Sequence, residues 1–116
     1  MATTLLRKYT ARPAGLYNDG TNVFVATDEG KVLKTVISGT ATTIFKNVVG
    51  TPISITGDGT NLYVGTAKGK LLQIVIATKA LTVLETFRHA VVSLGINSTN
   101  LYVGLSDGNV RLKDLA

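Results

Sequence analysis

The strongest constraint on this chain is that its sequence repeats itself. Residues 18–33, 57–72 and 96–111 align without a gap, at a spacing of 39 residues from Gly20 to Gly59 and again from Gly59 to Ser98. The first two segments, NDGTNVFVATDEGKVL and GDGTNLYVGTAKGKLL, share nine of sixteen positions, where unrelated sequences share roughly one. We therefore expect one supersecondary unit used three times.

Within each copy, short apolar runs separated by turn residues predict β-strands. Asp19-Gly20, Asp58-Gly59 and Asn97-Ser98 stand at equivalent turns, and such residue types accept the positive φ of tight turns. The predicted strands are 14–17, 22–27, 31–37 and 42–49 in the first copy, 53–56, 61–66, 70–76 and 81–88 in the second, and 91–95, 100–105 and 109–115 in the third. The chain is predicted to be all-β.

The third copy has no fourth strand after it, and the matching segment stands at the start of the sequence. Thr3-Thr4-Leu5-Leu6 aligns with Thr42-Thr43-Ile44-Phe45 at the same spacing of 39 residues. Three units of 39 residues need 117, close to the 116 present. One domain over 1–116 is predicted, made of a fourth strand (3–11), two complete units (14–49 and 53–88) and a unit of three strands (91–115), with the first strand completing the last sheet.

This pattern resembles the β-propeller repeat superfamily, and the phrase DGTNLYVGTAKGKLL is similar to the generic blade repeat of quinoprotein-like and YVTN-type propellers. The resemblance covers nearly the whole chain and implies three four-stranded blades. The Gly-His and Trp-Asp pairs of WD40 repeats are absent, and the chain contains no tryptophan. The resemblance therefore implies a blade fold, and the missing tryptophan speaks against a quinone; no cofactor is expected.

Three blades are fewer than the four to eight that commonly close a propeller, and open faces with unpaired edges favour association. We expect an oligomeric ring, with a six-bladed homodimer favoured over a nine-bladed trimer. In either ring, strand 3–11 of one chain would pair with strand 109–115 of the next, with Leu5, Leu6, Val110 and Leu112 at the assembly seam. Two alternatives stay open: a fragment of a longer propeller, and a monomer with three sheets around a pseudo-threefold axis.

The sequence gives little support for a catalytic or metal-binding function. Without cysteine there is no thiol nucleophile or cysteine-ligated zinc, and the acidic residues lack the spacing of a calcium loop. No phosphate-binding loop occurs, so neither catalytic nor metal-ligating residues are predicted. The net charge of +5 comes from scattered basic residues, which favours a solvated surface over a nucleic-acid site. The repeated aromatic position, Phe24, Tyr63 and Tyr102, is predicted to lie in the core between blades.

The loops before the first strand and after the second strand of each copy differ in sequence while the strands stay constant, which is the layout of a binding scaffold. The residues that we single out there for ligand or partner binding are Arg12, Lys68, Arg88, His89 and Asp107. His89 is the single histidine and has no equivalent in the other copies.

The favoured function is a non-catalytic structural or protein-interaction module that assembles with itself, a role that would suit a component of a viral or phage particle. The alternative is a small oligomeric lectin that binds carbohydrate. No secretory signal and no apolar run long enough to cross a membrane is visible. A cytoplasmic or virion-associated location is therefore expected.

Overall fold

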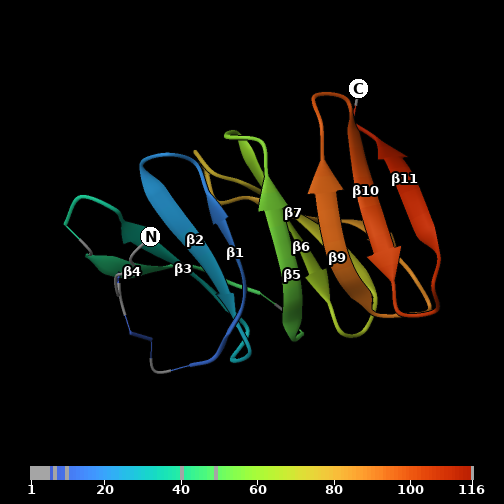
Figure 1. Ribbon diagram of the computed structural model, residues 1–116, viewed down its shortest axis with the longest axis horizontal. Helices are drawn as coiled ribbons and strands as arrows, with labels where there is room; N and C mark the ends of the chain where they lie inside the picture. Colours follow the sequence, from blue (N-terminus) through green and yellow to red (C-terminus); the bar gives the residue numbers. More distant parts are fainter. Residues whose placement is uncertain (1–5, 7, 10, 40, 49, 116) are drawn as a thin grey trace, which may run out of the picture.

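The structure, a computed structural model, describes residues 6, 8–9, 11–39, 41–48 and 50–115. Within them the chain forms eleven strands in three antiparallel sheets (Figure 1), here called blades 1, 2 and 3. These residues include no helix of the length and apolarity needed to span a membrane. Blade 1 contains β1 (Pro13–Asn18), β2 (Asn22–Thr27), β3 (Lys31–Val36) and β4 (Thr42–Asn47); blade 2 contains β5 (Pro52–Gly57), β6 (Asn61–Thr66), β7 (Lys70–Val75) and β8 (Leu81–Thr86); blade 3 contains β9 (Val91–Ile96), β10 (Asn100–Leu105) and β11 (Val110–Asp114).

The predicted strands of the three repeats are all present, and the second strand of each blade has the predicted bounds. The turns before these strands are built by the side chain that precedes them. Asp19 Oδ1 accepts hydrogen bonds from the backbone N–H groups of Thr21 (2.9 Å) and Asn22 (2.7 Å). Asp58 and Asn97 accept the same pair of bonds in blades 2 and 3. The repeated Thr-Asn pair thus supplies backbone donors, and the turn-forming acceptor is the residue two positions before it.

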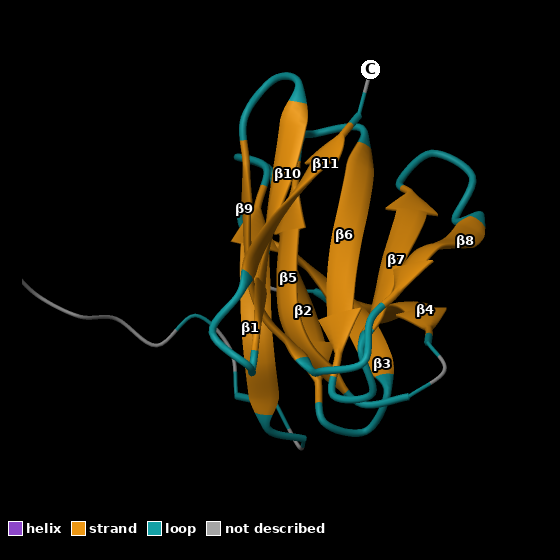
Figure 2. Ribbon diagram, turned by 90° about the vertical axis from the view of Figure 1, so that its right-hand side faces the viewer, coloured by secondary structure: helices purple, strands orange, loops and turns teal. Residues whose placement is uncertain are grey.

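The blades stack face to face in chain order, with blade 2 between the other two (Figure 1). The first strands β1, β5 and β9 lie side by side, and the last strands β4 and β8 lie on the opposite side of the molecule (Figure 2). This sequential stacking is what the repeat predicts for neighbouring blades. It differs from the alternative arrangement of three sheets around a pseudo-threefold axis.

The sheet of blade 3 has three strands, in the order β11-β10-β9. Of the predicted strand 3–11, residues 3–5, 7 and 10 lie outside the described part of the chain, Leu5 among them. Leu6, Lys8, Tyr9 and Ala11 are described and are not in a strand in the single chain. The pairing of this segment with β11 of another copy therefore stays a prediction.

Two apolar clusters hold the blades together. The cluster between blades 1 and 2, here called seam 1–2, contains Phe24, Phe45, Ile55, Leu62 and Val64 among its buried residues. The cluster between blades 2 and 3, seam 2–3, is made of Tyr63, Leu71, Val91, Leu101, Val103 and Leu105. Only blade 2 contributes one face to each seam, and its second and third strands, β6 and β7, are therefore apolar on both faces.

Candidate interaction surfaces

The repeated aromatic residue shows which face of each blade meets the next blade. Phe24 is fully buried in seam 1–2, and Tyr63 is 1% exposed in seam 2–3. Tyr102, their equivalent in blade 3, is 38% exposed because no blade follows. The prediction of an inter-blade core is thus confirmed for Phe24 and Tyr63, and Tyr102 marks the open face of blade 3.

The open face of blade 3 is apolar in the same pattern as the buried face of blade 2. Tyr102 lies opposite Leu112 in the β10–β11 pair, and Gly104 lies opposite Val110, so that these four residues share one face of the sheet. Val110 is 73% exposed and Leu112 59%. Leu71, the equivalent of Val110, is fully buried in seam 2–3. Blade 3 therefore displays an apolar face, matching the buried face of blade 2, that nothing in the described part of the chain covers.

The open face of blade 1 carries an apolar hollow of about 240 Å³. Leu16 and Val25 are paired on this face, and Leu16 is 62% exposed. Tyr9, from the segment before β1, lies beside it and shares a hydrogen bond of 2.6 Å between its hydroxyl and the Thr35 hydroxyl. The hollow is lined by Leu6, Tyr9, Pro13, Leu16, Val23 and Val25.

The lining of this hollow repeats the residues that hold Phe24 in seam 1–2. Leu16, Val23 and Val25 stand 39 positions before Ile55, Leu62 and Val64, which pack in that seam. Leu6 and Tyr9 stand 39 positions before Phe45 and Val48, which pack there too. The hollow thus has the same kinds of lining residues as seam 1–2, taken from the equivalents of both of the blades that form that seam.

The variable loops gather at one end of the blades, as the sequence predicts. The loop after the second strand is hydrogen-bonded to the segment before the first strand in all three blades: Asp28 N donates to Arg12 O (3.1 Å), Ala67 N to Thr51 O (2.9 Å) and Ser106 N to Ala90 O (3.0 Å). We call this end the loop face. The repeated bond makes it a constant frame on which the side chains differ.

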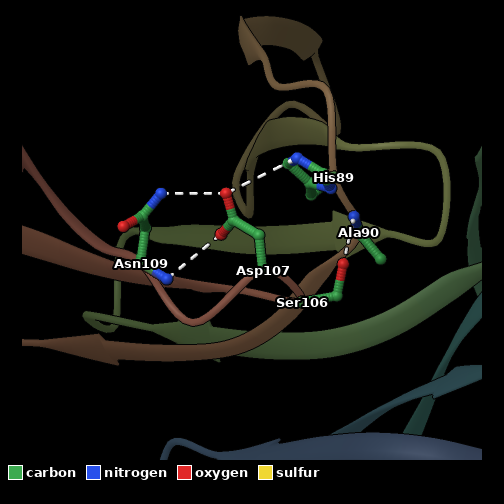
Figure 3. A network of polar contacts seen from close by, with 5 residues as sticks. All are labelled: His89, Ala90, Ser106, Asp107 and Asn109. Carbon is green, nitrogen blue, oxygen red and sulfur yellow. Dashed lines mark hydrogen bonds and ion pairs between the residues drawn. The ribbon is translucent and has the colours of Figure 1, made fainter.

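Three of the five residues singled out from the sequence, Arg88, His89 and Asp107, meet on the loop face at seam 2–3, and Figure 3 shows His89 and Asp107 there. His89 Nε2 lies 3.5 Å from Asp107 Oδ2. The Asp107 carboxylate also accepts hydrogen bonds from the Asn109 backbone N–H (3.1 Å) and side-chain amide (2.8 Å). Arg88 lines the same cleft, which has a volume of about 350 Å³. The lining is completed by Glu85, Thr86, Phe87, Leu105 and Arg111.

The other two residues lie elsewhere on the loop face. Arg12 is exposed before β1 and takes part in the repeated backbone bond. Lys68 lines a smaller hollow with Gly50, Thr66 and Lys70, on the blade 2 loops equivalent to those around His89. Sequence reasoning missed Arg111, although a signal was present: Arg111 replaces Leu33 and Leu72 of the other copies.

Electrostatics and metal ligands add little to these surfaces. The backbone hydrogen bonds from Asn22 and Thr21 lower the pKa of Asp19 below 3.8, and this carboxylate serves its turn. Within the part of the chain that the structure describes, no group of three His, Cys, Asp or Glu side chains could hold a metal ion. The surfaces are suited to binding through shape, apolar contact and charge.

No protein-family model and no curated protein sequence matches this chain. Solved structures match it strongly. The WD40 β-propeller domain of Doa1 superposes with a TM-score of 0.82 at 14% identity, over 95% of this chain and 40% of that one. The chain has the β-propeller fold.

Two computationally designed proteins are also similar to this propeller chain. Ika8 matches with a TM-score of 0.74 and 17% identity over 86% of this chain and 32% of its own, and Ika4 with 0.63 and 12% over the whole of both chains. This propeller chain thus spans about a third of the Ika8 chain and two fifths of the WD40 domain of Doa1. At such identities the likeness concerns the fold, and it favours neither a particle component nor a lectin.

Proposed function

We propose that this chain is a structural and protein-interaction module without catalytic activity, which closes a six-bladed ring by pairing with a second copy of itself and presents its loop face to other proteins. The observation that carries the proposal is the correspondence between the two open faces. Blade 3 displays an exposed tyrosine at the position of Phe24 and Tyr63, and blade 1 has an apolar hollow lined by the equivalents of the residues that hold Phe24.

The proposed closure places Tyr102 of one copy in the blade 1 hollow of the other. Val110 would then lie where Leu71 lies in seam 2–3, and it would lose most of its exposure to water. Two such contacts, each between blade 3 of one copy and blade 1 of the next, close a ring by rotation. The contact would remove the apolar surface of Tyr102 and Val110 from water. This favours association because each Å² of apolar surface removed from water contributes about 25 cal/mol.

The edge of β11 adds a second element to the proposed seam. The β3–β4 pair has Lys34 opposite Thr43, and the β7–β8 pair has Gln73 opposite Thr82. The equivalent pair in the ring is Leu112 of one copy opposite Thr4 of the next. Of the seam residues expected from the sequence, Leu6, Val110 and Leu112 would belong to this contact, and Leu6 lines the blade 1 hollow; Leu5 lies outside the described residues.

Ring closure can be tested with an engineered disulfide, because the chain contains no native cysteine that could interfere. In seam 1–2, a Cβ placed on Gly15 would lie 3.2 Å from Ile55 Cγ2. The equivalent positions across the proposed seam are Ser93 of one copy and Leu16 of the other, and this proximity suits a disulfide. We expect the Ser93→Cys/Leu16→Cys variant to oxidise to a covalent dimer with little larger product.

The matched control is Ser93→Cys/Ile44→Cys, because Ile44 is 53% exposed on the last strand of blade 1 and away from its hollow. This variant should stay mostly monomeric on a non-reducing gel. Equal cross-linking of the two variants, or none in the first, would contradict ring closure. A ladder that stops at three chains would replace the six-bladed ring by a nine-bladed one.

A further inference from the structure

We infer that the cleft at seam 2–3 is a binding site for carboxylate side chains, and that its partner is an acidic segment of another protein. This inference rests on the proposed role of the loop face as a partner-binding surface, and not on ring closure. It concerns Arg88, His89 and Arg111, which line one cleft of about 350 Å³ at the loop face.

The cleft is lined by two acids and two arginines, and in the part of the chain that the structure describes only the acids have partners. Its two acids already have partners: Glu85 lies 3.4 Å from the Lys113 ammonium, and Asp107 accepts two hydrogen bonds from Asn109 beside His89. Within the described residues, neither Arg88 nor Arg111 makes a hydrogen bond or ion pair through its guanidinium. Each guanidinium therefore keeps donors for an anion, and arginine suits carboxylates because it can bind both oxygens at once.

The repeat shows that the pair of arginines is specific to this seam. Arg111 occupies the position of Leu72, which is 2% exposed in seam 1–2, and His89 occupies the position of Gly50. At this position, therefore, one copy has exchanged a buried leucine for a guanidinium exposed in a cleft. Because the blade frame does not require a charge there, a ligand is the better explanation.

The shape and floor of the cleft favour a peptide over a small ion. Phe87 is half-buried and Leu105 is 6% exposed, so apolar surface lies beneath the cationic groups. A chain that carries several carboxylates could contact both arginines while its backbone or a neighbouring side chain covers Phe87. Because these hydrogen bonds involve charged groups, losing the two arginines should raise the dissociation constant about tenfold or more.

The test measures binding of a fluorescein-labelled peptide with four consecutive glutamates, and of its glutamine counterpart, to the whole chain. We expect the glutamate peptide to bind at least tenfold more tightly. The Arg88→Gln/Arg111→Leu variant should lose at least tenfold of that affinity. Leucine at position 111 restores the residue of the other two copies, so that the fold is kept.

The matched control is Lys68→Gln/Lys70→Gln, which removes the same charge from the hollow at equivalent loops of blade 2. It should change the affinity less than twofold. An equal loss in both variants would show general attraction to a cationic chain and would overturn the inference, as would equal binding of the two peptides. A single-stranded oligonucleotide that binds more tightly and needs the same arginines would reassign the site to nucleic acid.

The result of the peptide-binding test can be told apart from the result of the ring-closure test. The single histidine gives one imidazole signal by NMR, and that signal reports the occupancy of the cleft in a monomer or a dimer. A monomeric chain whose His89 signal responds to the glutamate peptide would keep the acidic-segment site while removing the ring. A dimer whose His89 signal stays unchanged at saturating peptide would keep the ring and overturn the site.

Discussion

Seam 2–3 and the open face of blade 3 are nearly the same surface in two environments. Tyr63, Gly65 and Leu71 lie in the first, and Tyr102, Gly104 and Val110 lie 39 positions later in the second. Leu71 is fully buried while Val110 is 73% exposed. Their exposure is set by the presence of a following blade and not by their composition. The comparison teaches that the same residue pattern is buried in one place and exposed in the other, and this contrast is the basis of the proposed pairing.

The largest expected effect comes from truncating the apolar residue at this position. Leu71→Ala leaves a cavity in seam 2–3 and should lower the free energy of unfolding by about 3 kcal/mol. Val110→Ala should change it by less than about 0.5 kcal/mol when measured in a Tyr102→Asp background that prevents association. Urea denaturation of both variants checks the difference. Similar losses at the two positions would mean that Val110 is covered within the single chain.

Gly65 in seam 2–3 and Gly104 on the open face of blade 3 offer a second contrast, in the cost of adding a methyl group. A Cβ on Gly65 would lie 2.7 Å from the Val91 Cβ, and it would also collide with the Ser54 hydroxyl. Gly65→Ala should therefore cost about 2 kcal/mol of unfolding free energy. A Cβ on Gly104 would meet the Ser93 hydroxyl, which can rotate away on an exposed face. Gly104→Ala should leave the stability of the Tyr102→Asp monomer nearly unchanged. Thermal unfolding of both variants measures this, and a large loss at Gly104 would refute it.

A buried hydrogen bond gives a smaller contrast. Ser54 Oγ donates to Val91 O across seam 2–3 at 2.8 Å, so Ser54→Ala should cost about 1 kcal/mol. Ser93 is the equivalent residue on the open face. Ser93→Ala should have no effect on the monomer and should weaken the dimer, as measured by its dissociation constant. No effect on the dimer would show that the third seam lacks this bond.

The smallest expected effect is a pH dependence of unfolding that comes from the turn of blade 1, which has Asp19 where the turn of blade 3 has Asn97. Backbone hydrogen bonds from Asn22 and Thr21 lower the pKa of Asp19 below 3.8. The charged Asp19 carboxylate thus stabilises the folded chain above pH 3.8. This contribution is lost as the pH falls through the lowered pKa. Asp19→Asn, which copies Asn97 of blade 3, should remove the pH dependence. Unfolding measured from neutral pH to below 3.8 tests this, and an unchanged pH profile would contradict it.

The repeat made the fold predictable, because one period fixed the strands, the turns and the buried aromatic position of every blade. The period also predicted which loops meet, since the same backbone bond joins them in all three blades. The cleft was harder to foresee. The replacement of Leu33 and Leu72 by Arg111 marked one of its residues, but only the stacking of blade 3 on blade 2 brings Arg111 and Glu85 beside His89.

The apolar hollow of blade 1 could not be predicted from the sequence either. Leu16, Val23 and Val25 match buried residues of blade 2, and periodicity alone assigns them to a core. Leu16 is nevertheless 62% exposed because no other blade packs on this face in the described part of the chain, which is a property of the tertiary arrangement. The position of Tyr9 against Thr35 likewise depends on the described segment before β1 lying on this face.

The mass of the chain in solution tests the central claim most directly. Light scattering on the size-exclusion peak should give twice the 12.2 kDa of one chain, and Tyr102→Asp should give the mass of one chain while keeping the β-sheet circular dichroism spectrum. A wild-type chain that stays at 12.2 kDa at the highest concentration tested, or a Tyr102→Asp variant that remains a dimer, would contradict the pairing of the two open faces.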